Sequence, residues 1–161
     1  MNGLRVGYAI CGSFCTFSKA IAQMERLVES GYEVYPIMSH NAYSTDTRFG
    51  KADEIVERIE KICRRNVIKS IVETEPIGPK NIVDIIAVAP CTGNTLSKIS
   101  NAITDTAVTM AVKSHLRCQK PVVIALASND SLGASAQNIG KLLNTKNISL
   151  FSQTLKMSSH S

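Results

Sequence analysis

The chain has 161 residues, 44% of them hydrophobic, which predicts a single domain with a sizeable core over residues 1–151 and a polar tail over residues 152–161. Its formal net charge is +5, but the basic residues are scattered and no aromatic residues interleave with them, which argues against a surface that binds nucleic acid. The uncharged runs are short, so we expect no membrane span and no signal peptide. The five cysteines contain no CxxC pair, so we expect no disulfide framework and no structural zinc site, and free thiols favour the cytoplasm.

Apolar runs along the chain predict five strands. They lie at residues 4–10, 32–38, 85–89, 121–127 and 147–151. Apolar side chains recur at helical spacing between them, within residues 17–28, 55–63, 94–101, 105–116 and 136–143. Because strands alternate with helices and the strongest strands are wholly apolar, the pattern predicts an α/β fold: a three-layer Rossmann-like (flavodoxin-like) parallel sheet with helices on both faces.

Three local features refine this pattern. Gly31 is expected to end the first helix as a C′ residue. Residues 67–68 and 71–72 predict a short extended piece. Pro90 cannot donate to a strand ladder and is therefore expected to end the third strand.

The connections that follow four of the strands are rich in Ser, Thr, Asn and Gly. They are residues 11–16, 39–47, 90–95 and 127–133. In a parallel sheet with right-handed crossovers these loops gather at the carboxyl edge, where open α/β sheets bind their ligands. The sequence therefore predicts a ligand site at this edge.

The first of these loops has the residue types of an anion site. Gly12 and Ser13 stand just before a helix, where a tight turn, a hydroxyl and the helix dipole can hold an anion. The G-x-G-x-x-G fingerprint is absent, and Ser13-Phe14 replaces the Lys-Ser/Thr of a Walker motif. An ordinary strand-to-helix turn is the alternative interpretation.

Side chains suited to acid–base chemistry are few. His40, at the end of the second strand, is a candidate acid or base, with a polar surface residue as the alternative. No Ser/His/Asp set can be assembled from the spacing, and the carboxylates form no recognisable metal set, so no metal site is expected. Cys11 and Cys91 are expected to fill space in the core.

Four motifs resemble one known family. Residues 90–95, Pro-Cys-Thr-Gly-Asn-Thr, resemble the Pro-x-Ser-Ala-Asn-Thr motif of the flavin-binding cysteine-decarboxylase superfamily. Residues 12–13 match its phosphate loop, residues 103–105 its Ile-x-Asp element, and residues 127–129 lie where it has Pro-x-Met-Asn. Order and spacing agree over about residues 4–148. The resemblance implies the same parallel fold and a bound FMN.

The resemblance also assigns contacts to this FMN. By position they are Gly12, Ser13 and Phe14 for the phosphate, Ser39 for the ribityl chain or ring, and Thr92, Gly93, Asn94, Thr95 and Ala127 for the flavin. The residue types agree, because hydroxyls and N–H groups suit phosphate and ribityl oxygens, and small residues leave room for a flat ring.

Within the superfamily, residues 11–16, 75–79 and 89–95 are most similar to members from spore-forming bacteria that act beside an A subunit in the last step to dipicolinic acid. The resemblance implies oxidation of a dihydrodipicolinate-type precursor, a dehydrogenase-like A subunit that carries NAD(P), and a place in the mother-cell cytoplasm. It also implies a homo-oligomer, a trimer or dodecamer with the flavin between subunits.

The sequence departs from the superfamily where the decarboxylases do their chemistry. No His stands near Pro76, where they carry a catalytic His, and Leu126 and Ser128 replace the Pro and Met of Pro-x-Met-Asn. These departures leave His40 and Asn129 as the candidate catalytic residues. The alternatives are an FMN-dependent decarboxylase- or prenyltransferase-like enzyme and a non-catalytic flavin-binding scaffold. The polar tail is expected to be truncated relative to the family.

Overall fold

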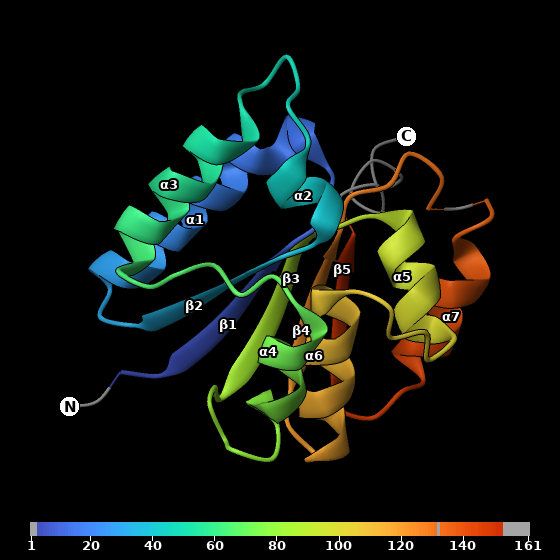
Figure 1. Ribbon diagram of the computed structural model, residues 1–161. Helices are drawn as coiled ribbons and strands as arrows, with labels where there is room; N and C mark the ends of the chain where they lie inside the picture. Colours follow the sequence, from blue (N-terminus) through green and yellow to red (C-terminus); the bar gives the residue numbers. More distant parts are fainter. Residues whose placement is uncertain (1–2, 132, 153–161) are drawn as a thin grey trace.

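A five-stranded, wholly parallel sheet forms the centre of the protein (Figure 1). The computed structural model describes residues 3–131 and 133–152. The strands are β1 (Arg5–Ile10), β2 (Glu33–Met38), β3 (Ile85–Cys91), β4 (Val122–Leu126) and β5 (Ile148–Ser152). They lie in the order β2-β1-β3-β4-β5, so the predicted α/β fold is confirmed, with all five predicted strands in place.

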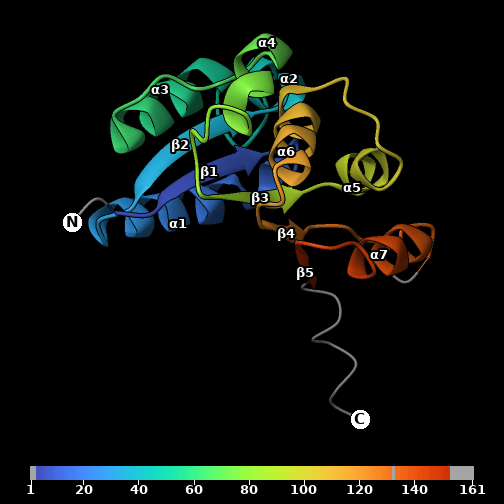
Figure 2. The ribbon, with the colours of Figure 1, turned by 90° about the horizontal axis from the view of Figure 1, so that it is seen from below.

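Helices lie on both faces of the sheet, as predicted. They are α1 (Phe17–Glu29), α2 (His40–Ser44), α3 (Ala52–Cys63), α4 (Ile71–Thr74), α5 (Gly93–Ser100), α6 (Ala107–Arg117) and α7 (Ala136–Leu143). Tyr8 and Ile10 of β1 pack with α1 and α3 in one cluster, and Ile86 and Val88 of β3 pack with α6 in the other. Figure 2 shows α1 and α6 on opposite sides of the sheet. None of the helices in the described residues is long and apolar enough to cross a membrane.

The first helix ends where the sequence predicts. Gly31 takes a φ of +88° just beyond α1, a conformation that costs a glycine little. The N–H of Tyr32 donates to the carbonyl of Leu27 at 3.0 Å, and that of Gly31 to the carbonyl of Val28 at 3.0 Å. This pair of hydrogen bonds is a Schellman motif, and it turns the chain into β2.

The side of the sheet that carries α1 is only partly covered. Val123 and Ala125 of β4 are half-buried on this side, and Phe151 of β5 is 63% exposed. α1 lies against β1 and β2, and Figure 2 shows β4 and β5 extending past it. Within residues 3–131 and 133–152 no helix covers β4 and β5 from this side.

The expectation that Pro90 ends the third strand is wrong by one residue. β3 continues through Pro90 to Cys91. The pairing with β4 shifts register between Val88 and Cys91, so Pro90 occupies an irregular step of the ladder, the kind of position where strands accept proline. The strand therefore tolerates proline at its carboxyl end.

The extended piece predicted around residues 67–72 is half right. Ile68 does extend the sheet beyond β2, since its N–H donates to the carbonyl of Pro36 at 2.8 Å. Ile71, however, begins the helix α4, because the Ser70 hydroxyl accepts from the N–H of Glu73 and the Glu73 carboxylate accepts from the N–H of Ser70. The sequence carries the pattern of this capping box, Ser-x-x-Glu.

Two further segments differ from a plain loop or tail. Residues 39–47, predicted as a polar loop, contain α2, and the Ser39 hydroxyl caps it by accepting from the N–H of Ala42. Of the predicted polar tail, Ser152 is the last residue of β5, and residues 153–161 lie outside the described residues.

Candidate functional site

The loops that follow β1, β2, β3 and β4 begin side by side at the carboxyl edge. The N–H of Ser39 donates to the carbonyl of Ile10 at 3.0 Å, and the N–H of Cys11 donates to the carbonyl of Pro90 at 3.2 Å. The N–H of Ala127 continues this row to the carbonyl of Cys91 at 2.8 Å. Backbone hydrogen bonds thus hold four polar loops in the order of their strands.

The first loop keeps a hydroxyl at its turn that does not cap the following helix. Ser13 is half-buried, and its hydroxyl makes no capping bond to the 3-10 helix η1 (Phe14–Thr16) that follows. A methyl group added at Gly12 would come 3.5 Å from the Cβ of Asn41, an ordinary contact. The turn therefore lies beside α2, and the face of Gly12 is already in ordinary contact with Asn41 and with the ring of Phe14.

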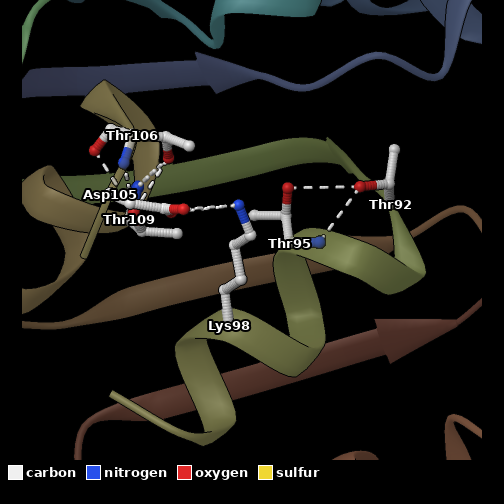
Figure 3. A network of polar contacts seen from close by, with 6 residues as sticks. All are labelled: Thr92, Thr95, Lys98, Asp105, Thr106 and Thr109. Atoms are coloured by element: carbon white, nitrogen blue, oxygen red, sulfur yellow. Dashed lines mark hydrogen bonds and ion pairs between the residues drawn. The ribbon is translucent and has the colours of Figure 1, made fainter. Parts of the chain in front are cut away.

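The third loop is a capped helix start. The Thr92 hydroxyl accepts from the N–H of Thr95 at 3.2 Å and donates to the Thr95 hydroxyl at 3.1 Å (Figure 3). Asn94 is exposed in the first turn of α5. The first N–H groups of a helix lack intrahelical partners, so this turn presents donors and a positive dipole end at the edge.

The fourth loop touches the third. A methyl group added at Gly93 would come 3.4 Å from the Oγ of Ser128 and 3.3 Å from the Oγ of Ser135. Ala127 is half-buried between the two loops, whereas Asn129 is exposed. The loops that follow β3 and β4 are therefore in close contact.

Two buried thiols join the first loop to the third. Cys11 and Cys91 are 1% and 0% exposed. Hydrogen bonding to Cys91, helped by the Thr95 hydroxyl, holds the pKa of Cys11 below its ordinary value, and the same contact with Cys11, together with burial, raises the pKa of Cys91. Both thiols pack in the core, as expected, and support the loops from beneath.

The two candidate catalytic residues do not meet. His40 is exposed at the start of α2, and its Nδ1 lies 3.0 Å from the hydroxyl of Tyr43. His40 follows β2 and Asn129 follows β4, and two strands separate β2 from β4. At ordinary strand spacing that is about 14 Å, too far for both to act on one atom within a single chain.

Other polar side chains of the described residues contribute to the stability of the fold. Asp84 pairs with Arg5, whose Nη2 lies 2.7 Å from a carboxylate oxygen. Both carboxylate oxygens of Asp105 lie 3.0 Å from Lys98 Nζ, which ties the end of α5 to the segment before α6 (Figure 3). His115 is fully buried on α6. No metal-binding cluster of His, Cys, Asp and Glu occurs in the part of the chain that the structure describes.

A cavity of about 420 Å³ adjoins the loops on the side of the sheet that carries α1. We call it the α1–β5 cavity, because it runs from Thr16, Lys19 and Gln23 at the start of α1 to Phe151 of β5. Of the predicted cofactor contacts only Ala127 lines it. The polar stripe of α1 at spacings of three and four residues was the available sequence signal, but only the fold shows that it faces a hollow.

Comparisons with known proteins agree with this architecture. A family model described as "Flavoprotein" matches residues 1–157. The B subunit of dipicolinate synthase from Bacillus subtilis (strain 168) is 44% identical over 148 residues, which cover 92% of this chain and 74% of that protein. The crystal structure of the dipicolinate synthase B subunit from Bacillus halodurans C has a TM-score of 0.82 at 44% identity, covering 93% of this chain and 78% of that chain.

More distant structures share the fold alone. Burkholderia xenovorans DmrB, solved in complex with FMN, has a TM-score of 0.77 at 16% identity and covers 97% of this chain and 92% of its own. The FMN-dependent cysteine decarboxylase SpaF has a TM-score of 0.73 at 19% identity, with 92% and 85% covered.

Proposed function

The chain belongs to the flavoprotein family, together with the dipicolinate synthase B subunits, and from this premise we propose that it is the flavin-binding subunit of an enzyme that oxidises dihydrodipicolinate to dipicolinic acid during sporulation. The observation that carries the proposal is 44% identity to the Bacillus subtilis protein across 92% of the chain. The family model, which matches residues 1–157, spans all four loops of the carboxyl edge. We place this activity in the mother-cell cytoplasm.

FMN is the cofactor that these loops suit. The residues that would hold its phosphate are Gly12, Ser13 and Phe14, those for the ribityl chain and ring are Ser39, Thr92, Gly93, Asn94 and Thr95, and Ala127 would border the ring. The Ser13 hydroxyl, which makes no capping bond to η1, and the exposed amide of Asn94 support this fit. The chemistry that FMN supplies when bound is acceptance of two electrons.

A partner subunit completes the proposal. His40 and Asn129 stand apart, and His40 already contacts Tyr43, so the described residues bring no acid–base pair to the edge. We assign that chemistry to a dehydrogenase-like A subunit carrying NAD(P), with this chain as a homo-oligomer, a trimer or dodecamer. A dodecameric assembly has been solved for a UbiX-like decarboxylase of Escherichia coli O157:H7, with a TM-score of 0.76 at 16% identity.

A non-catalytic flavin-binding scaffold is the second candidate. Pro76, where the decarboxylases carry their catalytic His, lies in the 3-10 helix η2 (Glu75–Ile77). The Ser114 hydroxyl of α6 donates to the carbonyl of Glu75, so Pro76 lies near the end of α6 and not among the four loops (Figure 1). A proline in place of that histidine argues against a decarboxylase and is equally compatible with a scaffold.

Flavin binding is the first expectation to test. The purified chain is expected to take up FMN and to show flavin absorbance, and Asn94→Ala is expected to weaken binding about tenfold through loss of one hydrogen bond. Asn101→Ala, at the other end of the same helix, is the matched control and is expected to leave binding unchanged. A chain that stays colourless after incubation with FMN would remove the cofactor assignment.

Dipicolinate formation then separates the catalytic role from the scaffold. The A subunit alone, the chain alone and the mixture are compared for dipicolinate produced. A rate that requires both proteins and drops with Asn94→Ala supports the proposed function. Equal rates with and without this chain would reduce it to a scaffold.

A further inference from the structure

Two buried cysteines lie side by side on neighbouring strands, beneath the first and third loops of the carboxyl edge. The N–H of Cys11 donates to the carbonyl of Pro90 at 3.2 Å. Such a bond aligns the donor with the residue that follows the acceptor, as Ile86 and Val122 show, so Cys11 lies opposite Cys91. Both side chains belong to the core cluster that packs with α6, on one face of the sheet. Neighbouring strands are about 4.8 Å apart and a disulfide joins Cα atoms about 4.4–6.8 Å apart, so the two cysteines are within bonding reach.

The two sulfur atoms interact with each other and with the start of α5. A hydrogen bond with the Cys91 thiol, helped by the Thr95 hydroxyl and the backbone of Thr92, holds the pKa of Cys11 below its ordinary value. The same contact, together with burial, raises the pKa of Cys91, so this residue keeps its proton. Disulfide formation needs a sulfur with thiolate character beside a second sulfur, and the pair provides both.

We propose that Cys11 and Cys91 are a redox switch: hydrogen peroxide closes them to a disulfide, and the disulfide weakens FMN binding at the loops above them. The second part of this inference rests on the proposed function. Forming the bond draws the Cys11 sulfur toward Cys91 and away from the contacts with Thr92 and Thr95, so the first turn of α5 loses a support. Thr92 and Thr95 belong to the loop assigned to the flavin, and oxidation therefore acts on that loop from beneath.

The oxidation is a two-electron step. Cys11 and Cys91 are 1% and 0% exposed, which excludes bulky reagents, so the expected oxidant is hydrogen peroxide, a molecule little larger than water. The Cys11 sulfur attacks one peroxide oxygen, the O–O bond breaks, and Cys11 becomes a sulfenic acid. The Cys91 sulfur then displaces the oxygen from Cys11 as water. In sum, both S–H bonds are lost, one S–S bond forms, and the peroxide is reduced to two waters.

Two other cysteines serve as internal controls. Cys63 is buried in the core cluster on the other face of the sheet, and burial raises its pKa to about 11, so it is expected to stay a thiol. Cys15 is exposed in η1 and is expected to gain oxygen, which shows that the peroxide was active.

The test treats the full, reduced chain with hydrogen peroxide and maps its thiols by mass spectrometry after digestion. The peptides of Cys11 and Cys91 are expected to be joined, with the loss of two hydrogen masses, and to separate again with dithiothreitol. FMN binding is expected to weaken about tenfold on oxidation, as loss of one hydrogen bond does, and to recover on reduction. In Cys91→Ala, or in Cys91→Ser if the alanine variant does not fold, peroxide is expected to leave the FMN affinity unchanged. Cys15→Ser is the matched control and is expected to keep the tenfold loss.

Several outcomes would overturn the inference. They are thiols at Cys11 and Cys91 that survive peroxide when Cys15 is fully oxidised, oxygen added to Cys11 with no cross-link, a disulfide that leaves the FMN affinity unchanged, and a loss of FMN affinity that persists in Cys91→Ala. If the reduced chain takes up no FMN, the proposed function itself is contradicted, whereas the peptide map still decides whether the disulfide forms.

Discussion

Replacing Gly78 with alanine is expected to destabilise the protein by about 3 kcal/mol, the upper end of overpacking costs. The new methyl carbon would overlap the carbonyl oxygen of Ser114 and would lie 3.0 Å from the sulfur of Cys118. The φ of Gly78 is −70°, which alanine adopts freely, so the cost is steric. Because the nearest atom belongs to the backbone of α6, the helix itself has to move.

Gly140→Ala provides a control of opposite sign. Gly140 lies inside α7, and a methyl group added there meets nothing within 4 Å. Removing glycine from a helix interior is expected to stabilise the protein by about 1 kcal/mol. Urea unfolding of both variants measures the difference. A Gly78→Ala protein as stable as the parent would show that the turn before β3 does not press against α6.

Ser114→Ala tests the same contact if Gly78→Ala yields no folded protein. The Ser114 hydroxyl donates to the carbonyl of Glu75 at 2.5 Å and accepts from the N–H of Gly78 at 3.0 Å. Its loss is expected to cost about 1–2 kcal/mol, because both partners lose a hydrogen bond where the chain is closely packed. An unchanged urea midpoint would contradict a tight junction between η2 and α6.

Much of the fold follows from local patterns in the sequence, and the wrong predictions have local causes. The wholly apolar strands and the stripe of α1 follow directly from periodicity. β-Branched residues favour strands, which predicts an extended backbone at Ile71. The capping box of Ser70 and Glu73 instead stabilises a helix that begins at Ile71. Pro90 lacks a donor, which predicts a strand end, and the register shift that accommodates it depends on β4.

The candidate site, like the fold, could be predicted only in part from the sequence. The topology alone places the loops at one edge of the sheet. For this reason the sequence is enough to assign Gly12 and Asn94 to the same site. The α1–β5 cavity could not be foreseen, because it depends on how far β5 extends past α1. The contact between His40 and Tyr43 depends on α2. The polar composition of residues 39–47 predicts a loop, so this helix was not expected.

His115 of α6 is a buried titratable residue, away from the loops of the carboxyl edge, that has no part in the proposed function. The ring nitrogens of His115 are buried and make no well-formed hydrogen bond within the described residues, although the backbone of Asp84 and of Pro121 approaches the ring and favours its charged form. Burial, and then the charge of Lys120, lower the pKa of His115 from 6.5 to about 4. The imidazole is therefore neutral in the folded protein at any pH well above 4. Protonation would place a charge in the core beneath α6, where burial costs more than the nearby backbone of Asp84 and Pro121 returns.

Acidification is therefore expected to destabilise the protein before its carboxylates titrate. The folded state resists a proton that the unfolded chain accepts near pH 6.5. Above pH 6.5 His115 therefore leaves the free energy of unfolding unchanged, and as the pH falls toward 4 it lowers that free energy by about 1.4 kcal/mol per pH unit. The total loss is about 3 kcal/mol. The measurement is the free energy of unfolding from urea titrations between pH 7.5 and 4.5.

The controls separate this effect from other acid groups. The pKa of Asp84 is lowered by Arg5, and that of Glu73 by Ser70, so their contributions are lost only below their ordinary values of 3.8 and 4.5. The loss between pH 6.5 and 5 therefore belongs to a histidine. His115→Leu is expected to flatten the curve there, while His40→Gln, an exposed site, keeps the parent slope. A steep slope that survives His115→Leu would show that another group, and not the buried imidazole, sets the acid limit of this fold.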